Sequence, residues 1–371
     1  MSGFPPVDPN LSQAELIIDL GALVDNWRKL AARIAPAVCA AVVKADAYGV
    51  GADEASRALF DAGCRTFFVA QPSEGVRVRA IVGADASIYV LNGLIDGAGR
   101  LESYASHALK PVLGSLDDAR IWSASGLAGT VAAALHVDTG MNRLGLRADE
   151  ALALAPQAQA LGLDLMMSHF VSSEAADDPI NARQIAQFES VRNAFAGLRA
   201  SIANSAGLFL PQKPFHDLVR PGYALYGGNP TPGASNPMRP VATLRAPIIQ
   251  MREIGVGETV GYNAQWRAKR VTRLATIGVG YADGLPRALM GTQTHVGGEA
   301  LVEGRRCPFV GRVSMDLTVI DVTDAPSVRP GAMVELLGAE ITVDDVAARA
   351  GTIGYEILTN LGRRYARTYR V

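Results

Sequence analysis

Cysteine is scarce in this chain, and the few present form no recognisable pair. The 371 residues include only Cys39, Cys64 and Cys307, and no two of them have CxxC spacing. We therefore expect neither a disulfide framework nor a cysteine-based zinc site, and a reducing, cytoplasmic setting fits this usage. The five histidines are scattered along the chain, so no metal centre is expected.

Excess charge and long apolar runs are missing too. Lysine and arginine total 35 against 36 acidic residues, a formal net charge of −1, so neither nucleic acid nor an anionic membrane is expected as a main partner. No uninterrupted apolar run could span a bilayer, and residues 1–15 lack the pattern of a signal peptide. With 49% hydrophobic residues, the chain can bury a large core, and its length predicts one large and one smaller domain.

Short β-like runs alternate with helix-like stretches from about residue 38 to 226. The expected strands are Val38–Val43, Thr66–Ala70, Ser87–Leu91, Leu109–Leu113, Val131–Val137, Leu163–His169, Ser201–Asn204 and Leu218–Tyr226. Amphipathic segments such as 53–62 and 181–196 separate them. Eight such repeats indicate a (β/α)8 TIM-like barrel. A doubly wound sheet is the main competitor, but it usually has a glycine-rich phosphate turn after its first strand, where this chain has Lys44 and Tyr48.

The composition changes after residues 227–240, GGNPTPGASNPMRP, which are dense in turn-forming residues and predict a linker. Later segments, such as RLATIGVGYADG and RCPFVGRVSMDLTVIDV, are β-rich and separated by turns. We therefore expect a barrel domain over residues 12–235 and a mostly antiparallel β domain over residues 236–371.

The run AAVVKADAYGVGA, at 40–52, is the most informative stretch. A lysine at the end of a buried strand is easily desolvated, which lowers its pKa and frees the amine for Schiff-base chemistry. Taken alone, Lys44 is better explained as a strand-end charge that reaches solvent. Further polar groups, however, fall near expected strand ends: Arg143, His169, Asn204, Ser205 and Arg220. Active residues of a barrel gather where its strands end, so these groups predict one cationic site with hydroxyl and amide groups suited to a phosphate.

Nine motifs between residues 40 and 357 carry a family resemblance. They are AVVKADAYGVGA, HVDTGMNRLG, MSHF, ANSAG, VRPGYALYG, VGYNAQW, GVGYADG, VGRVSMD and GTIGYEI. With them the sequence closely resembles the alanine racemases, pyridoxal-phosphate isomerases built from a barrel and a C-terminal β domain. The resemblance implies interconversion of L- and D-alanine in a cytoplasmic homodimer, either to supply D-alanine as a peptidoglycan precursor or to degrade alanine.

The resemblance also implies the catalytic groups. Lys44 should hold pyridoxal phosphate covalently and act as the base on one face of the substrate α-carbon. Tyr281, contributed by the other subunit, should be the base on the opposite face, since racemisation needs a proton removed on one side and supplied on the other. His169 should contact Tyr281 and Arg220. Arg220 should face the pyridine nitrogen of the cofactor. Because arginine donates hydrogen bonds but does not accept protons, it keeps that nitrogen unprotonated, and the cofactor ring is then a weaker electron sink.

The remaining roles concern the cofactor's phosphate and the substrate. The resemblance assigns the phosphate to Tyr48, Ser205, the backbone amides of Gly222 and Tyr223, and Tyr355, with Asn204 in the same cofactor-binding set. Arg143 should contact the phenolic oxygen of the cofactor and the substrate carboxylate. From the second subunit, the Met315 backbone should meet that carboxylate, with Asp316 in a supporting role.

One position departs from the family pattern. Many members carry a carbamylated lysine seven residues before the arginine of the GMxRLG motif, and its negative charge orients that arginine. Here the position is His136, which cannot form a stable carbamate. We hypothesise that Arg143 is held instead by a carboxylate such as Asp138, by water, or by an anion such as chloride. Ser314 stands where the family often has a cysteine, and little cost is expected.

Three other functions compete with alanine racemisation. A decarboxylase of basic amino acids would use a cysteine of the second domain and an acidic residue against the pyridine nitrogen, whereas this chain has GRVSMD and Arg220. A non-catalytic pyridoxal-phosphate-binding protein would consist of the barrel alone. Racemisation of other amino acids, such as serine or lysine, is the third. Broad-specificity relatives are often exported, whereas no signal is recognised here, and a narrow opening between Tyr281 and Tyr355 would favour a small side chain by crowding.

Overall fold

The computed structural model describes residues 14–94 and 98–371. The chain forms two compact units, which are described separately. The larger comprises residues 23–225 and 229–238; the smaller comprises the described residues 14–22 together with 226–228 and 239–371. Across the described ranges, no helix is both long and apolar enough to cross a membrane.

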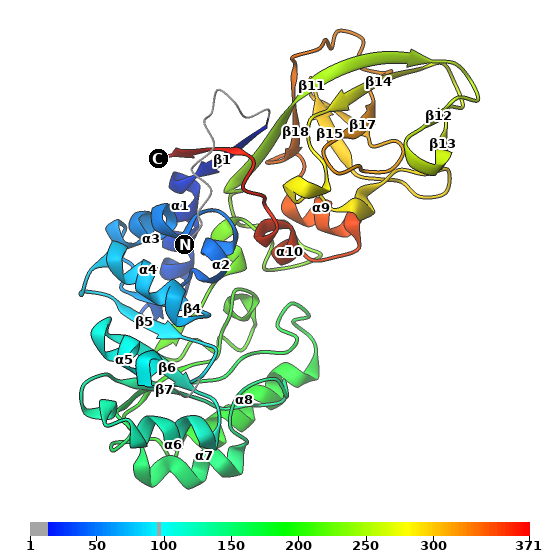
Figure 1. Ribbon diagram of the computed structural model, residues 1–371. Coiled ribbons are helices and arrows are strands. Elements are labelled where there is room, and N and C mark those ends of the chain that lie inside the picture. The colour runs from blue at the N-terminus through cyan, green and yellow to red at the C-terminus, as the bar shows by residue number, and fades with distance from the viewer. Residues whose placement is uncertain (1–13, 95–97) are drawn as a thin grey trace. The chain divides into compact units, whose positions relative to one another are not determined.

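Parallel strands form the centre of the larger unit (Figure 1). Seven of them follow one another in a single sheet: β3 (Ala41–Val42), β4 (Thr66–Val69), β5 (Ser87–Val90), β6 (Leu109–Leu113), β7 (Ala133–His136), β8 (Leu163–Met167) and β9 (Arg199–Ser201). The eighth, β10 (Leu218–Val219), pairs in parallel with β2 (Val38–Cys39), one residue before β3. The backbone N–H of Arg220 also donates to the carbonyl of Ala203. Because β10 therefore bonds on both sides, the strands curl into a TIM-like barrel, and the predicted fold class is confirmed.

Helices cover the outside of this sheet (Figure 1). They are α1 (Leu20–Ile34), α3 (Ala52–Asp61), α4 (Pro72–Val82), α5 (Ala98–Ser106), α6 (Leu116–Ala124), α7 (Ala148–Leu154) and α8 (Pro179–Arg192), while α2 (Lys44–Tyr48) is a single short turn. In α3 the buried positions are 52, 55, 56 and 59, the spacing of one helix face. Helix α8 begins where the Asp178 carboxylate accepts the N–H of Ile180 and proline occupies the first turn, two strong start signals.

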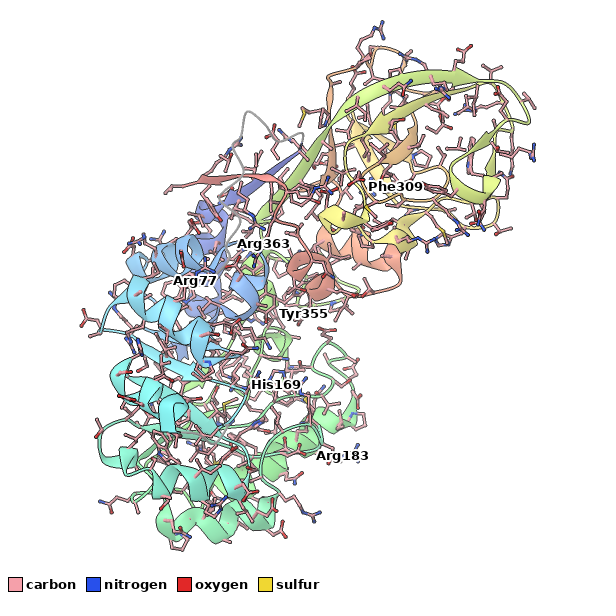
Figure 2. The ribbon with its side chains drawn as sticks, in the orientation of Figure 1. Arg77, His169, Arg183, Phe309, Tyr355 and Arg363 are labelled. Carbon is pink, nitrogen blue, oxygen red and sulfur yellow. The ribbon has the colours of Figure 1, made fainter. Side chains whose placement is uncertain are left out.

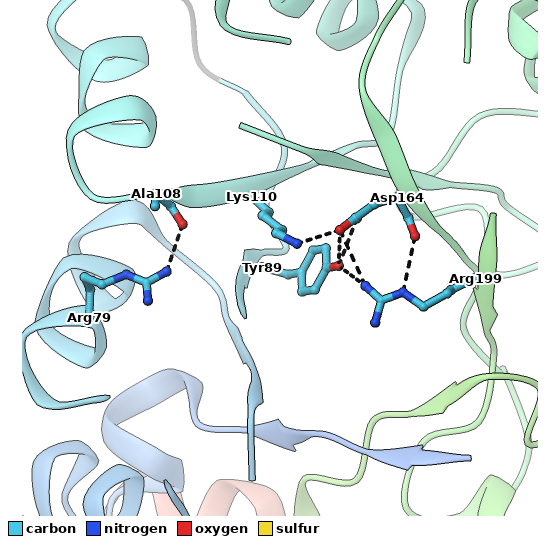
Figure 3. Close-up of polar contacts among 6 residues, drawn as sticks. All are labelled: Arg79, Tyr89, Ala108, Lys110, Asp164 and Arg199. Atoms are coloured by element: carbon cyan, nitrogen blue, oxygen red, sulfur yellow. Dashed lines mark hydrogen bonds and ion pairs between the residues drawn. The ribbon is translucent and has the colours of Figure 1, made fainter. Parts of the chain in front are cut away.

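The strands bury both faces, but the barrel interior contains one polar cluster (Figure 3). All four residues of β4 and of β7 are buried, as expected for parallel strands covered by helices. Within the barrel, Asp164 accepts hydrogen bonds from Tyr89 (2.9 Å) and Lys110 (2.5 Å), and Arg199 donates to the Tyr89 hydroxyl at 2.8 Å. This cluster joins β5, β6, β8 and β9, and its three charged members lie at the first or second residue of their strands.

A stack of aromatic rings leads from that cluster toward the other end of the strands. The rings of Tyr89 and Phe68 are parallel, with centroids 4.9 Å apart. The guanidinium of Arg220, just after β10, lies 5.8 Å from the centroid of the Phe68 ring. The barrel interior is therefore a packed column with a charged group at each end, not an open channel.

The smaller unit is a mostly antiparallel sheet. Its main path runs β16 (Arg305–Pro308), β15 (Glu299–Val302), β18 (Met333–Leu337), β11 (Ala242–Ile254), β1 (Glu15–Asp19) and β19 (Ala366–Arg370). Strands β14 (Thr272–Ile277) and β17 (Thr318–Asp321) extend it from β11, and β12 (Thr259–Val260) and β13 (Trp266–Arg267) form a hairpin. The unit also carries the helices α9 (Val343–Ala350) and α10 (Gly354–Thr359). Strand β1 pairs antiparallel with β11 and parallel with β19, so the first described residues belong to this sheet although they precede the barrel.

Candidate active site

Lys44 lies two residues beyond β3, at the end of the barrel where the strands terminate. Burial lowers the pKa of its amine, the nearby Arg143 lowers it further, and Glu74 partly opposes both. Across the described part of the chain, no hydrogen bond or ion pair holds the amine. A lysine whose neutral form is favoured in this way is a stronger nucleophile, which is the property that covalent chemistry with a carbonyl requires.

The residues that follow Lys44 form a left-handed helical turn. The φ angles of Ala45, Asp46, Ala47 and Tyr48 are 54°, 55°, 52° and 54°. The turn closes with the N–H of Gly49 donating to the carbonyl of Ala45 at 2.9 Å. Left-handed helix costs L-residues about 1–2 kcal/mol each, so four in succession need support from their surroundings. None of the four is glycine, and their residue types carried no signal for this conformation.

Tyr48, Ser205 and Gly222 meet in a small cradle. The Ser205 hydroxyl oxygen accepts backbone N–H groups of Gly222 (3.0 Å) and Ala224 (3.1 Å). A serine oxygen has two lone pairs and one proton, so this hydroxyl still has its proton to donate. A Cβ added to Gly222 would lie 2.2 Å from the Tyr48 hydroxyl, so the glycine is needed for this approach. Burial raises the pKa of Tyr48, which keeps its phenol a donor. Two hydroxyl donors in one place suit a phosphate.

Arg220 is almost completely buried, at 4% exposure. Its guanidinium donates to the Ser201 hydroxyl and to the carbonyl of Ser168. Across the described residues, no carboxylate forms an ion pair with it. Burial lowers the pKa of Arg220 to about 9, so the group remains a cation at neutral pH. Such a group stabilises a ligand atom that accepts a hydrogen bond and disfavours protonation of that atom.

Two histidines beside Arg220 are neutral at physiological pH. His136 ends β7, and His169 follows β8 (Figure 2). Burial, followed by the charge of Arg220, lowers the pKa of His136 to about 4 and that of His169 to about 3. The hydrogen bonds of Arg220 go to serine and backbone oxygens, and none in the described chain joins it to the His169 ring. The resemblance implied such a contact, which stays a prediction.

The loop that carries Arg143 is organised by Asp138. One oxygen of the Asp138 carboxylate accepts the N–H groups of Gly140 (2.9 Å) and Met141 (2.8 Å), and the other accepts that of Asn142 (2.9 Å). The carboxylate therefore fixes the backbone of the loop. In the described residues no hydrogen bond or ion pair joins it to the guanidinium of Arg143, which is exposed.

The β domain carries Tyr281 and Met315 on two loops that are hydrogen-bonded together. The backbone N–H of Tyr281 donates to the carbonyl of Ser314 (3.0 Å), and that of Ala282 to Met315 (2.9 Å). Arg364 bridges the same loops through ion pairs to Asp283 (3.2 Å) and Asp316 (2.8 Å). The side chains of Tyr281 and Met315 are 42% and 54% exposed.

The structure thus distributes the sequence-predicted residues over both units. The barrel unit holds Lys44, Tyr48, His136, Arg143, His169, Asn204, Ser205, Arg220, Gly222 and Tyr223, while the β unit holds Tyr281, Met315, Asp316 and Tyr355. Within the barrel unit, the charges of Lys44, Arg143 and Arg220 all lower the pKa of His169, so these groups are close neighbours. The Asn204 side-chain oxygen accepts Gly207 N–H (2.9 Å) and the Ser173 hydroxyl (2.8 Å).

Sequence reasoning missed two supporting residues. The side chain of Gln184, on α8, donates to the carbonyl of His169 and to the Thr139 hydroxyl, both at 3.0 Å, and accepts the N–H of Val171. Glu74, on α4, accepts the N–H of Ala45. Both lie on the outer helices, and a lone Gln or Glu in an amphipathic helix has no pattern that distinguishes it from a surface residue.

These groups fit pyridoxal phosphate. Lys44 offers a nucleophilic amine for the aldehyde, the Tyr48–Ser205–Gly222 cradle offers donors for the phosphate, and Arg220 offers a cation for the pyridine nitrogen. The chain thus combines a reactive lysine and an anion cradle at the mouth of an α/β barrel with a separate β domain. This combination defines a pyridoxal-phosphate enzyme of the barrel class.

Comparison with known proteins identifies the family. The profile of the alanine racemase N-terminal domain matches residues 18–230, and that of the alanine racemase C-terminal domain matches residues 241–369. The chain therefore belongs to the alanine racemase family.

Individual relatives agree over the whole length. An alanine racemase of Methylobacterium nodulans is 57% identical over 96% of each chain. Biosynthetic and catabolic alanine racemases of Agrobacterium fabrum are each 45% identical over 96% of this chain and over 93% and 92% of their own lengths. The crystal structure of an alanine racemase from Bartonella henselae with covalently bound pyridoxal phosphate superposes with a TM-score of 0.90 at 38% identity, covering 97% of this chain and 100% of that one.

Proposed function

We propose that the protein interconverts L-alanine and D-alanine, using pyridoxal phosphate held by Lys44. The observation that carries the proposal is the desolvated Lys44 amine at the mouth of a barrel whose cradle suits a phosphate. When bound, the cofactor supplies an electron-withdrawing ring that acidifies the α-proton of the amino acid. The product D-alanine would serve as a peptidoglycan precursor, or the reaction would degrade alanine. The equal identity to biosynthetic and catabolic relatives favours neither role.

Two bases on opposite faces of the α-carbon account for inversion. Lys44 takes or returns the α-proton on one face, because the lowered pKa of its amine increases the neutral fraction that can act as a base. Tyr281 takes or returns the proton on the other face through its phenolic oxygen. Removal by one group and delivery by the other produces the opposite enantiomer, so neither group alone completes the reaction.

The remaining residues orient the reactants. Tyr48, Asn204, Ser205, Gly222, Tyr223 and Tyr355 belong to the cofactor-binding set. Arg220 would donate to the pyridine nitrogen and disfavour its protonation, and His169 would contact Arg220 and the partner subunit's Tyr281. Arg143 contacts the substrate carboxylate together with the Met315 backbone, and Asp316 supports them.

His136 replaces the charged group that holds the arginine in many relatives. Burial and Arg220 keep its ring neutral, so it supplies no negative charge to Arg143. We propose that Asp138 acts indirectly, through its three backbone hydrogen bonds in the Arg143 loop, and that water or an anion such as chloride meets the guanidinium itself.

We further propose a cytoplasmic homodimer with shared active sites. Tyr281 and Met315 are both substantially exposed on their own chain, an arrangement suited to residues that complete the site of a partner. The three free, buried cysteines are compatible with a reducing compartment. Residues 12–235 would form the cofactor-binding part of each subunit and residues 236–371 the β domain, to whose sheet Glu15–Asp19 also contribute a strand.

The decisive experiment follows the α-proton and the product together. The purified protein, loaded with pyridoxal phosphate, is incubated with L-alanine in deuterated water. Proton NMR follows the loss of the α-proton, and a D-alanine-specific oxidase detects product. We expect deuterium incorporation together with D-alanine. Exchange without D-alanine would mean that only one base acts on the substrate. Release of carbon dioxide, or turnover of serine or lysine but not alanine, would replace this function by one of the competing ones.

Complementation tests the shared sites. Lys44→Ala and Tyr281→Phe should each inactivate the homodimer. When equal amounts of the two proteins are mixed under exchange conditions, half of the dimers contain one subunit of each variant. One of the two sites in each such heterodimer is intact, so activity should recover to about a quarter of the wild-type value. No recovery in proven heterodimers would mean that each site is built within one chain.

A further inference from the structure

The first residue of the left-handed turn that follows Lys44 is held by the carboxylate of Glu74, on the neighbouring helix α4. Oε1 of Glu74 accepts the N–H of Ala45 at 2.7 Å. Oε2 accepts the N–H groups of Ala70 (2.7 Å) and Gln71 (3.1 Å), at the junction of β4 and α4. Ala45 is the first residue after Lys44 and the first in the left-handed conformation. The carboxylate therefore ties the backbone beside Lys44 to the neighbouring strand.

One turn further along α4, Arg77 (Figure 2) contacts the same left-handed segment. Its guanidinium donates to Asp46 at 2.9 Å and to Asp53 at 2.6 Å. The Asp46 carboxylate also accepts the N–H of Ala52 at 3.0 Å. These groups are about half exposed, so solvent screens their ion pairs and each contributes little stability. Helix α4 thus contacts the turn at two consecutive residues.

We propose that Glu74 is a positioning residue for Lys44: its carboxylate holds the left-handed turn that sets the direction of the lysine side chain. The inference rests on the proposed function of Lys44 as the lysine that holds the cofactor. Four positive φ angles in a row have little intrinsic stability, and without the bond at Ala45 the first of them can relax to ordinary geometry. Relaxation at Ala45 would turn the Lys44 Cα–Cβ bond away from the site.

Glu74 has a second, electrostatic effect on the same amine. The charged and titratable groups that act on Lys44 or respond to it are Glu74 from α4, Arg143 from the loop after β7, and His169 from the end of β8. Burial and Arg143 lower the pKa of Lys44, and Glu74 raises it. Removal of the Glu74 charge should therefore lower the pKa of Lys44 further, a change that a purely structural residue would not produce.

The test variant is Glu74→Gln in the full-length chain. Glutamine has the same size, but one of its two terminal groups is an NH2 that cannot accept an N–H. Two quantities are measured on protein freed of cofactor. The first is the pH at which labelling of the Lys44 amine by acetic anhydride is half-maximal, measured by mass spectrometry. The second is the rate at which added pyridoxal phosphate becomes attached to Lys44, measured by absorbance. We expect the labelling midpoint to fall and attachment to slow by about tenfold or more, because small misplacements of a reacting group have effects of this size.

Two further variants separate charge from geometry. Glu54→Gln, in the first turn of α3, removes the same charge from a glutamate with no side-chain bond in the described chain, and it should change neither quantity by more than about twofold. Glu74→Asp keeps the charge but is shorter by one methylene and cannot reach both segments. It should restore the labelling midpoint while attachment remains slow.

The outcomes distinguish the possibilities. A folded Glu74→Gln protein that labels and attaches cofactor as the wild type does would overturn the proposal. If Glu74→Gln does not fold, Arg77→Gln replaces it, with slower attachment expected in the same direction and unchanged attachment counting against the proposal. Failure of the proposed function would look different: the wild type would attach cofactor without racemising alanine, or would not attach it at all, while the labelling of Lys44 would still report on Glu74.

Discussion

Replacement of Gly222 by alanine is the sharpest test of the phosphate cradle. A Cβ at this position would lie 2.2 Å from the Tyr48 hydroxyl oxygen and 2.8 Å from the ring carbon that bears it. Ordinary contacts between such atoms are about 3.5 Å, so the phenol would have to move by roughly 1 Å. Tyr48 is buried and is itself the last of the four left-handed residues, so it has little freedom to move without losing its place in the cradle.

The magnitude follows from the hydrogen bond that would be lost. A hydrogen bond to a charged group such as phosphate contributes about 1.5–3 kcal/mol, and each 1.4 kcal/mol is a factor of about ten in affinity. Gly222→Ala should therefore weaken the binding of pyridoxal phosphate roughly 10- to 150-fold. Overpacking should also lower the free energy of unfolding of the cofactor-free protein by about 1–3 kcal/mol.

The assay is a spectroscopic titration of cofactor-free protein with pyridoxal phosphate, alongside urea unfolding. Gly129→Ala is the matched control, because a Cβ there meets nothing within 4 Å and both quantities should stay unchanged. Gly222→Ala combined with Tyr48→Phe should recover part of the lost stability, since it removes the closer of the two clashing atoms, but not the lost affinity. A folded Gly222→Ala protein that binds the cofactor as tightly as the wild type would refute the reasoning about the cradle.

Three other predictions concern the histidines, the barrel interior and the β-domain loops. The pKa of His136 is lowered from 6.5 to about 4 and that of His169 to about 3, so the unfolded chain binds these protons more tightly than the folded chain does. The free energy of unfolding should therefore fall by roughly 1.5–2 kcal/mol per histidine as the pH is lowered from 6.5 to 5. A flat urea-unfolding profile over that window would contradict the shift. Asp164→Asn should lower the free energy of unfolding by about 1–3 kcal/mol, because two cations lose their shared, partly buried counter-ion; an unchanged urea midpoint would mean that solvent already screens them. Arg364→Ala should slow inversion of alanine about three- to tenfold more than α-proton exchange with retention, because it loosens the loops of Tyr281 and Met315 and only the Tyr281 loop carries a base; equal slowing of both in the NMR assay would exclude a specific effect on that base.

Much of the barrel could be predicted because its strands are buried on both faces. Strands such as Thr66–Val69 and Ala133–His136 appear in the sequence as short apolar runs. The rule that functional groups follow strand ends then selects Lys44, His169 and Arg220 as candidates, and their functional roles stay a prediction. The rule works because every parallel strand delivers its last residue to the same end of the barrel.

The local support of these residues could not be predicted in the same way. Ala45, Asp46 and Ala47 are ordinary helix-compatible residues, and their left-handed conformation depends on Glu74, which lies on another helix. Asp138 was considered a direct partner for Arg143, yet its carboxylate accepts the backbone N–H groups closest to it. In each case tertiary or local backbone contacts, which have no periodicity in the sequence, decide the outcome.

The position of β1 makes the barrel an insertion within another sheet. Strand β1 is synthesised before both of its neighbours: β11 follows only after the barrel, and β19 only after the other described strands of the β domain. During synthesis the barrel can therefore close while β1 still lacks both partners, and its unpaired edges need protection in that interval. Pairing across roughly two hundred intervening residues carries a high loop-closure cost. The step that joins β1 to β11 and β19 in one sheet should accordingly be slow and late, and the nascent β domain stays incomplete until β19 has been synthesised.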